Sequence, residues 1–231
     1  MVPPLRRLTA PRAAAVAGIL FAVLFATSLI LMRTGLGDDP FVGSQWYERG
    51  AAQVRVALFL LPYAGISFLW FIGVVRDRLG EFEDRFFATI FLGSGLVFLA
   101  MVFVSSAIAG GLLVYGGTEA PAEDVAVFGR VLMLQISNIY ALRMAGVFMI
   151  SLGTIWLRTG LMPRSMALVT YAVAVVLLFV TDLSLWVTMV FPAWVFAVSV
   201  GIIVLTRRRG REQAASAVAP DGGPDQPVSE G

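Results

Sequence analysis

Hydrophobic residues along this chain are gathered into six long stretches, and short polar segments separate them. A helix needs about 20 apolar residues to cross roughly 30 Å of hydrocarbon, and most of the stretches are close to or above that length. The pattern therefore predicts an all-α fold: a polytopic membrane protein built as a bundle of six transmembrane helices. The six predicted spans are residues 13–32, 56–75, 86–115, 125–157, 166–181 and 183–206.

The predicted spans differ in length and in their interruptions. Residues 86–115 and 125–157 are longer than the bilayer requires, so we expect them to tilt or to project beyond the outer face. Residues 166–181 fit only if that helix stands nearly upright. Pro62 and Pro192 fall inside spans, so we expect each to kink its helix while neighbouring helices satisfy the freed carbonyls.

The polar segments alternate in charge from one side of the predicted bundle to the other. The segment RDRLGEFEDR, residues 76–85, carries three Arg residues among four acidic ones and separates the second and third spans. The basic clusters on this side are Arg6, Arg7, Arg12, Arg76, Arg78, Arg85, Arg158, Arg164, Arg207, Arg208, Arg209 and Arg211. The opposite segments carry Asp38, Asp39, Glu48, Glu119, Glu123, Asp124 and Asp182. By the positive-inside rule, both termini are predicted to be cytoplasmic.

This orientation divides the chain into three parts. Residues 1–12 are a basic cytoplasmic segment, residues 13–206 are the transmembrane domain, and residues 207–231 are a basic and then disordered cytoplasmic tail. The disorder is expected from residue 212 onward, because that stretch is small, polar and rich in Pro and Gly and has nothing to bury.

Composition supports a membrane environment and excludes several kinds of chemistry. Of 231 residues, 58% are hydrophobic and only 14% are charged. A soluble domain of this size has more charged and fewer hydrophobic residues. All 17 basic residues are Arg, and the chain has no His and no Cys. Disulfides, thiolate sites and His-based metal, haem or protease centres are therefore excluded. We expect a protein without a cofactor or metal that is not an enzyme.

The first candidate site is a group of polar residues at membrane depth, where ionisable side chains are costly and often functional. Arg143 lies 15 residues before Arg158, which places it roughly 22 Å from the cytoplasmic boundary. The functional hypothesis joins five residues into an outward-facing pocket for an anionic ligand or a lipid headgroup: Arg143, Arg55, Asp182, Tyr140 and Asn138. The structural alternative has Arg143 pairing with Asp182 or extending its charge to the interface.

The second candidate site is the cytoplasmic loop between the second and third spans. Residues 73–80, GVVRDRLG, resemble the first part of the cytoplasmic loop motif of major facilitator transporters. The resemblance implies a transporter in which the Asp and the basic residues form an ion-pair latch. The match stops at Gly80, because Glu81 and Phe82 stand where two basic residues are expected.

Two other interpretations apply to the same loop. In one, its carboxylates only favour the positive end of the next helix, and its Arg residues only set the orientation. In the other, residues 81–87 contact an ATPase, as in a permease subunit. The candidate contact residues are Asp77, Arg78, Glu81, Glu83 and Asp84.

Residues 11–206 as a whole resemble a recurring type of actinobacterial integral membrane protein. Residues 70–100 and 141–150 carry this resemblance, which implies no activity and supplies no functional residues. We therefore expect an accessory, sensor or assembly role in the plasma membrane, and the alternative is a small transporter or permease subunit. The expected partner is the lipid bilayer, with a second copy or another membrane protein as candidates. Nucleic acid is not expected, because the Arg residues lie at the ends of apolar stretches.

Overall fold

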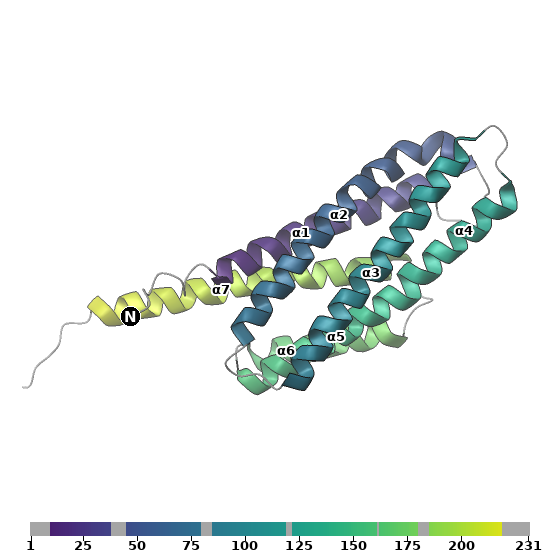
Figure 1. Ribbon diagram of the computed structural model, residues 1–231. Helices are drawn as coiled ribbons and strands as arrows, with labels where there is room; N and C mark the ends of the chain where they lie inside the picture. The colour runs from purple at the N-terminus through teal and green to yellow at the C-terminus, as the bar shows by residue number, and fades with distance from the viewer. Residues whose placement is uncertain are drawn as a thin grey trace, which may run out of the picture.

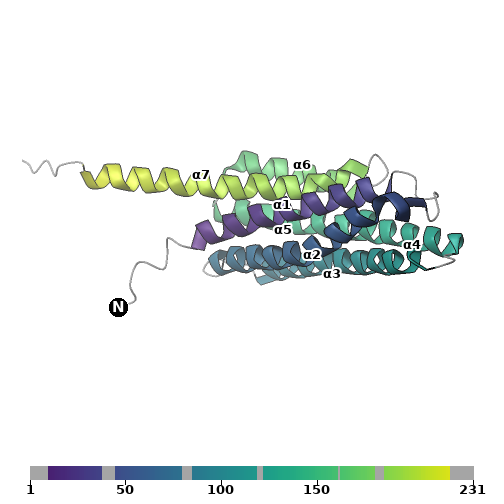
Figure 2. The same cartoon turned by 90° about the horizontal axis from the view of Figure 1, so that it is seen from above.

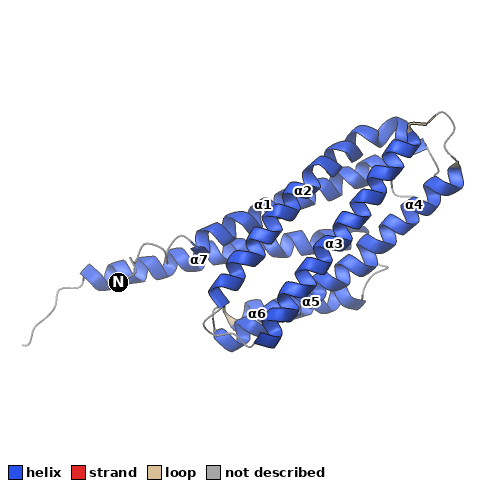
Figure 3. Ribbon diagram, in the orientation of Figure 1, coloured by secondary structure: helices blue, strands red, loops and turns tan. Residues whose placement is uncertain are grey.

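The computed structural model describes residues 10–37, 45–79, 85–118, 122–160, 162–179 and 185–218, which are almost entirely helical (Figure 3). The helices in chain order are α1 (Ala10–Leu36), α2 (Gln45–Leu79), α3 (Arg85–Gly116), α4 (Glu123–Gln135), the π-helix η2 (Ile136–Ala141), α5 (Leu142–Thr159), α6 (Arg164–Phe179), the 3₁₀-helix η3 (Leu185–Met189) and α7 (Val190–Val218). Within these residues the all-α prediction is confirmed.

Among the described residues, five helical segments are long and apolar enough to cross a membrane. They are Ala13–Leu36, Gly50–Arg76, Phe86–Gly116, Glu123–Thr159 and Val187–Arg207. The segment Arg164–Phe179 is apolar but shorter, as the hydrophobic pattern predicted for the fifth span. The structure therefore has the composition of a helical membrane protein.

Three element boundaries or shapes differ from the hydrophobic pattern. Helix α2 begins at Gln45, eleven residues before the apolar stretch, so its first turns are polar. Helix α7 continues to Val218, through residues expected to be unstructured, because segment 211–218 is rich in helix-forming Arg, Glu, Gln and Ala. The fourth predicted span contains the π-helix η2 between α4 and α5, which the pattern did not indicate.

The two prolines also behave differently from each other. Pro62 lies inside the continuous helix α2. Pro192 is the third residue of α7, directly after the 3₁₀-helix η3. A proline in the first turn of a helix removes no intrahelical hydrogen bond, so Pro192 lies at a helix start and does not interrupt α7.

The helices form an elongated bundle in which neighbours in sequence mostly run antiparallel (Figures 1 and 2). Helix α1 packs against α2 and α7, α3 packs against α2, α4 and α5, and α6 packs against α5. Helix α1 begins and α7 ends at the same end of the bundle, and α7 extends well past the other helices there (Figure 2).

The centre of the bundle is a cluster of aromatic rings around Phe68 of α2. Its ring centroid lies 4.6 Å from that of Phe21, 5.4 Å from those of Phe98 and Phe148, and 5.9 Å from that of Phe191. These partners come from α1, α3, α5 and α7, so one side chain contacts four other helices. Tilted and edge-on ring pairs of this kind add to the packing of a core.

Glycines allow the closest helix contacts. A Cβ atom on Gly50 of α2 would overlap the carbonyl oxygen of Gly35 of α1, and one on Gly18 would overlap the hydroxyl of Ser199 of α7. Small residues at such positions let helix backbones approach each other, as is common in membrane bundles. By contrast, a Cβ on Gly111 of α3 would meet nothing within 4 Å.

Candidate functional site

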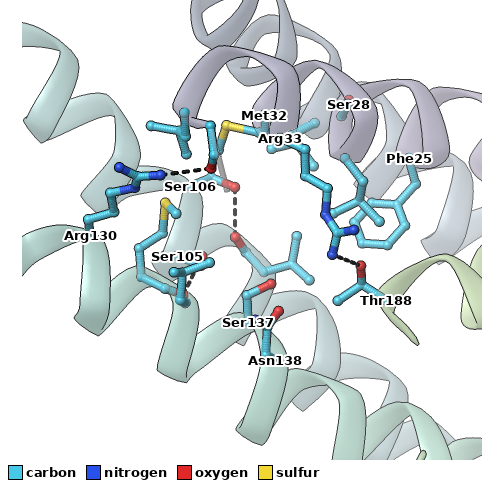
Figure 4. A pocket seen from close by; sticks show the side chains of 17 residues that line it. Phe25, Ser28, Met32, Arg33, Ser105, Ser106, Arg130, Ser137, Asn138 and Thr188 are labelled. Carbon is cyan, nitrogen blue, oxygen red and sulfur yellow. Dashed lines mark hydrogen bonds between the residues drawn. The ribbon is translucent and has the colours of Figure 1, made fainter. Parts of the chain in front are cut away.

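A partly open pocket lies above the aromatic cluster, between α1 on one side and α3, α4 and η2 on the other (Figure 4). The space open to the centres of water-sized molecules is about 80 Å³. Its lining residues are Phe25, Ser28, Leu29, Met32, Arg33, Leu36 and Gly37 from the α1 segment, Leu61 from α2, Val102, Ser105 and Ser106 from α3, Arg130, Met133 and Leu134 from α4, Ser137 and Asn138 from η2, and Thr188 from η3. The lining is thus mostly apolar with a few polar groups, as in typical ligand sites.

Arg130 is the most deeply buried charged residue in the described part of the chain, with 2% of its surface exposed. Its Nη2 donates a hydrogen bond to the carbonyl oxygen of Gly37, 2.8 Å away. Gly37 follows the last residue of α1 in the left-handed conformation (φ 72°), and its N–H donates to the carbonyl of Arg33. Arg130 therefore ties α4 to the carboxyl end of α1, where a positive charge complements the helix dipole.

Arg33 lines the same pocket from α1. Its Nη2 donates a hydrogen bond to the hydroxyl oxygen of Thr188 at 3.3 Å, and Thr188 is buried. Thr188 precedes Phe191 of the aromatic cluster by three residues, about one helical turn. The Arg33 guanidinium is therefore directed into the bundle and ends close to the aromatic cluster. Figure 4 shows Arg33 and Arg130 on opposite sides of the pocket.

The π-helix η2 brings two consecutive polar residues to the pocket. Ser137 and Asn138 both line it, and in the view of Figure 4 they lie between the two arginines. Neither side chain makes a hydrogen bond within the part of the chain that the structure describes. A π-turn widens the helix locally and is frequent at functional sites. The hydroxyl and the carboxamide are thus placed to contact a ligand.

The other three serines of the pocket differ from Ser137, because their hydroxyl groups donate hydrogen bonds to helix carbonyls. Ser28 donates to the carbonyl of Leu24 and Ser106 to that of Val102, each one turn back in its own helix. Ser105 donates to the carbonyl of Met133 and so links α3 to α4. These hydroxyls satisfy helix carbonyls, as serines in apolar helices commonly do, and present only acceptor oxygens to the pocket.

The pocket is closed on the side of the aromatic cluster. Phe25 is both a lining residue and a member of the cluster, with its ring 5.9 Å from that of Phe98. Phe98 in turn lies 4.7 Å from Phe191. These rings are almost fully buried. The site is therefore a pocket with an aromatic floor.

The residues proposed from the sequence for an outward-facing pocket are only partly brought together. Asn138 lines the pocket, whereas Tyr140, Arg143 and Arg55 are exposed and are not among the lining residues. Arg143 follows Asn138 by five residues, which on a helix turns its side chain to a different face. Asp182 lies outside the described residues. The cations of the pocket are thus Arg33 and Arg130, and not Arg143 and Arg55.

A signal for these two arginines exists in the sequence. Most Arg residues lie in the basic clusters at one end of the predicted spans, but Arg33 and Arg130 lie toward the opposite end and within apolar surroundings. The sequence alone does not show that both face one space, because that depends on the rotation of α4 about its axis.

The cytoplasmic loop contact falls outside what the structure describes. Glu81, Glu83 and Asp84 lie in the gap between residues 79 and 85, and the side chains of Asp77 and Arg78 are likewise outside the described part. That hypothesis stays a prediction.

Comparisons with protein-family models, with curated proteins and with solved structures find no match to this chain. In the part of the chain that the structure describes, the fold and the site define a helical bundle with five membrane-length helices and a cationic pocket between α1 and α4.

Proposed function

We propose that this is a six-span plasma-membrane protein with cytoplasmic termini that binds an anionic ligand in the pocket between α1 and α4. The observation that carries the binding proposal is the presence of two arginines, Arg33 and Arg130, in the lining of one largely apolar pocket.

The membrane part of this proposal is supported by the outer surface of the bundle. Large apolar side chains are exposed on several helices, among them Phe59, Trp70, Leu168 and Phe179. Such an extensive apolar surface requires a nonaqueous environment. Helix α6 has 16 residues, about 24 Å in length, and would span a locally thinned bilayer. With α6 counted as a sixth span, the Arg clusters and the positive-inside rule support cytoplasmic termini and a pocket in the outer half.

The choice of an anion follows from the chemistry of arginine. A guanidinium stays protonated at any physiological pH, so its burial cannot be relieved by losing the charge. It presents five N–H donors in one plane, so it can hold a helix carbonyl or a hydroxyl and also bind a carboxylate or phosphate. Arg33 and Arg130 contribute two positive charges to the lining, and these charges attract a negatively charged ligand.

Binding without catalysis fits the lining better than an enzymatic reaction does. The described lining residues include no His, Asp or Glu, so the pocket holds no ordinary general base. An accessory or sensor role, in which ligand binding stabilises one arrangement of the helices, requires no such group. A transporter has less support, because the aromatic floor would have to open to let a ligand pass.

Thermal unfolding of the purified protein in detergent tests the proposal with a panel of inorganic phosphate, sulfate, octanoate and hexyl phosphate. At 100 times its dissociation constant, a bound anion should add about 2.7 kcal/mol to the stability of the folded state, which raises the melting temperature by roughly 5–10 °C. The variant Arg33→Gln should lose this response.

The matched control is Arg143→Gln, which removes an exposed arginine that does not line the pocket. This variant should keep the full response. If no member of the panel stabilises the wild-type protein, or if Arg143→Gln abolishes the effect as well, the proposed binding function is wrong.

A further inference from the structure

The size and the lining of the pocket narrow the class of ligand, on the assumption that the proposed anion binding is correct. A water molecule needs about 10–15 Å³ of space measured for its centre and occupies about 30 Å³ of liquid. The measured 80 Å³ therefore holds an organic ion of roughly ten non-hydrogen atoms. A hydrated inorganic ion would leave the apolar part of the lining without a contact. A whole phospholipid is larger than the pocket.

The lining combines polar and apolar groups, as the binding of an amphiphile requires. The guanidinium of Arg33, together with Ser137 and Asn138, supplies donors for the oxygens of an anionic group. Apolar side chains from three helices complete the wall, namely Phe25 of α1, Leu61 of α2 and Val102 of α3. Burying methylene groups against such a wall adds affinity of about 0.8 kcal/mol each, which an inorganic ion does not gain.

We infer that the pocket binds a small amphiphilic anion, a phosphate or carboxylate that bears a short apolar chain. The anionic group lies between Arg33 and Arg130 and is contacted by Ser137 and Asn138 of the π-helix. The chain lies against Phe25, Leu61 and Val102. Asn138 contributes to the choice of ligand, because a hydrogen bond from its carboxamide requires a ligand oxygen at the right position. Long-range attraction between net charges does not impose that requirement.

Titrations with matched probes test this inference on the full-length protein in detergent, with thermal stability as the readout. Hexyl phosphate carries both features, inorganic phosphate lacks the chain, and hexanol lacks the charge. Hexyl phosphate should bind at least about tenfold more tightly than either of the others, because each lacks one set of contacts. Micelle effects of the probe are removed by comparison with Arg33→Gln under identical conditions.

Two further variants separate the parts of the site. Asn138→Leu should weaken the binding of hexyl phosphate and of inorganic phosphate alike by about tenfold, the usual effect of losing a hydrogen bond to a charged group, because both probes present the anionic group that Asn138 contacts. Val102→Trp fills the apolar side and should abolish binding of hexyl phosphate. Because Val102→Trp could also disturb folding, its melting temperature without a ligand is compared with that of the wild type. Asn138→Leu tests the site by a second change that does not depend on the folding of Val102→Trp.

The outcomes distinguish the inference from the proposed function. If inorganic phosphate binds as tightly as hexyl phosphate, the inference of an amphiphilic ligand is wrong and the anion-binding function stands. If hexanol binds as tightly as hexyl phosphate, or if no probe binds, the anion-binding function is wrong as well. A short-chain phosphatidic acid tests whether the ligand is a lipid headgroup. If it binds more tightly than hexyl phosphate, the ligand is a lipid headgroup and the inference of a small free ligand is wrong.

Discussion

Individual side chains show how a membrane bundle holds charge and packs closely. Arg130 is buried, yet its charge lies at the carboxyl end of α1, where the carbonyl of Gly37 accepts its hydrogen bond. A helix carboxyl end carries partial negative charge, so this contact offsets part of the cost of burial. The same arginine therefore has a structural role in the tie between two helices and a proposed role in ligand binding.

The contact between Gly35 and Gly50 gives the clearest prediction for a single residue. The variant Gly50→Ala should lower the free energy of unfolding by about 1–3 kcal/mol, because its Cβ would overlap the carbonyl oxygen of Gly35 and force α1 and α2 apart. Thermal or denaturant unfolding in detergent measures the change. The matched control is Gly111→Ala, whose Cβ meets nothing within 4 Å, and which should leave stability unchanged or raise it by up to about 1 kcal/mol. Equal effects of the two variants would contradict the close helix contact.

The sequence predicted Asn138 as a pocket residue and placed Arg143 and Arg55 beside it. Hydropathy indicates the depth of a residue along a helix but not the direction in which it points. Five residues separate Asn138 from Arg143, and the π-helix η2 between α4 and α5 changes the rotation of everything before it. Arg130, Met133, Leu134 and Ser137 follow the regular helical spacing and share one face, whereas Arg143, beyond η2, points elsewhere.

Among the secondary-structure elements, η2 is the one that most affects the proposed site. It interrupts a helical segment of 37 residues, Glu123–Thr159, at the level of the pocket. Most of its side chains are partly exposed, whereas the following helix α5 has many fully buried residues such as Phe148, Met149 and Leu152. Local stability should therefore fall sharply from α5 to η2.

Hydrogen exchange measured by mass spectrometry tests this difference. Amides of residues 136–141 should exchange at least about tenfold faster than those of residues 146–152, corresponding to about 1.4 kcal/mol less free energy of local opening. The reason is that η2 has π-helical hydrogen bonds and borders a pocket that admits water. The α5 peptide, from the same helical segment, serves as the internal reference. Uniform protection across both peptides would contradict a locally weakened turn.

The boundaries of the other elements show what the hydrophobic pattern can and cannot predict. It located the apolar part of each long helix closely, because the thickness of the hydrocarbon layer sets how many apolar residues a spanning helix needs. It missed the first turns of α2 and the last turns of α7, because those turns are polar and depend on helix propensity. Pro192 was expected to be a kink and is in the first turn of α7, a difference that depends on where η3 ends.

The whole molecule combines a packed aromatic centre with a polar pocket displaced toward one end. The apolar stretches located the long helices of the described residues, but they did not indicate which helices would be neighbours. The arrangement around Phe68 depends on side-chain packing among five helices, and no local pattern encodes it. The pocket is a consequence of this arrangement, because α1 and α4 face each other above the rings without filling the space between them.

The absence of cysteine from the natural sequence makes a direct test of the pocket possible. A single cysteine placed by Ser137→Cys lies in the pocket lining, and Thr118→Cys lies exposed beyond α3 at the same end of the bundle. Both should react in intact cells with membrane-impermeant thiosulfonate reagents, if that end faces outward. The positive potential of Arg33 and Arg130 should make an anionic, sulfonate-bearing reagent react faster at residue 137 than a cationic, trimethylammonium-bearing one.

The decisive quantity is the ratio of these two reaction rates at residue 137, with and without Arg33. We predict a preference for the anionic reagent of about tenfold or more in Ser137→Cys, and a clear decrease of that preference when Arg33→Gln is added. Labelling only after the membrane is permeabilised, or a ratio that does not change when Arg33 is replaced, would contradict an outward-facing pocket that binds anions.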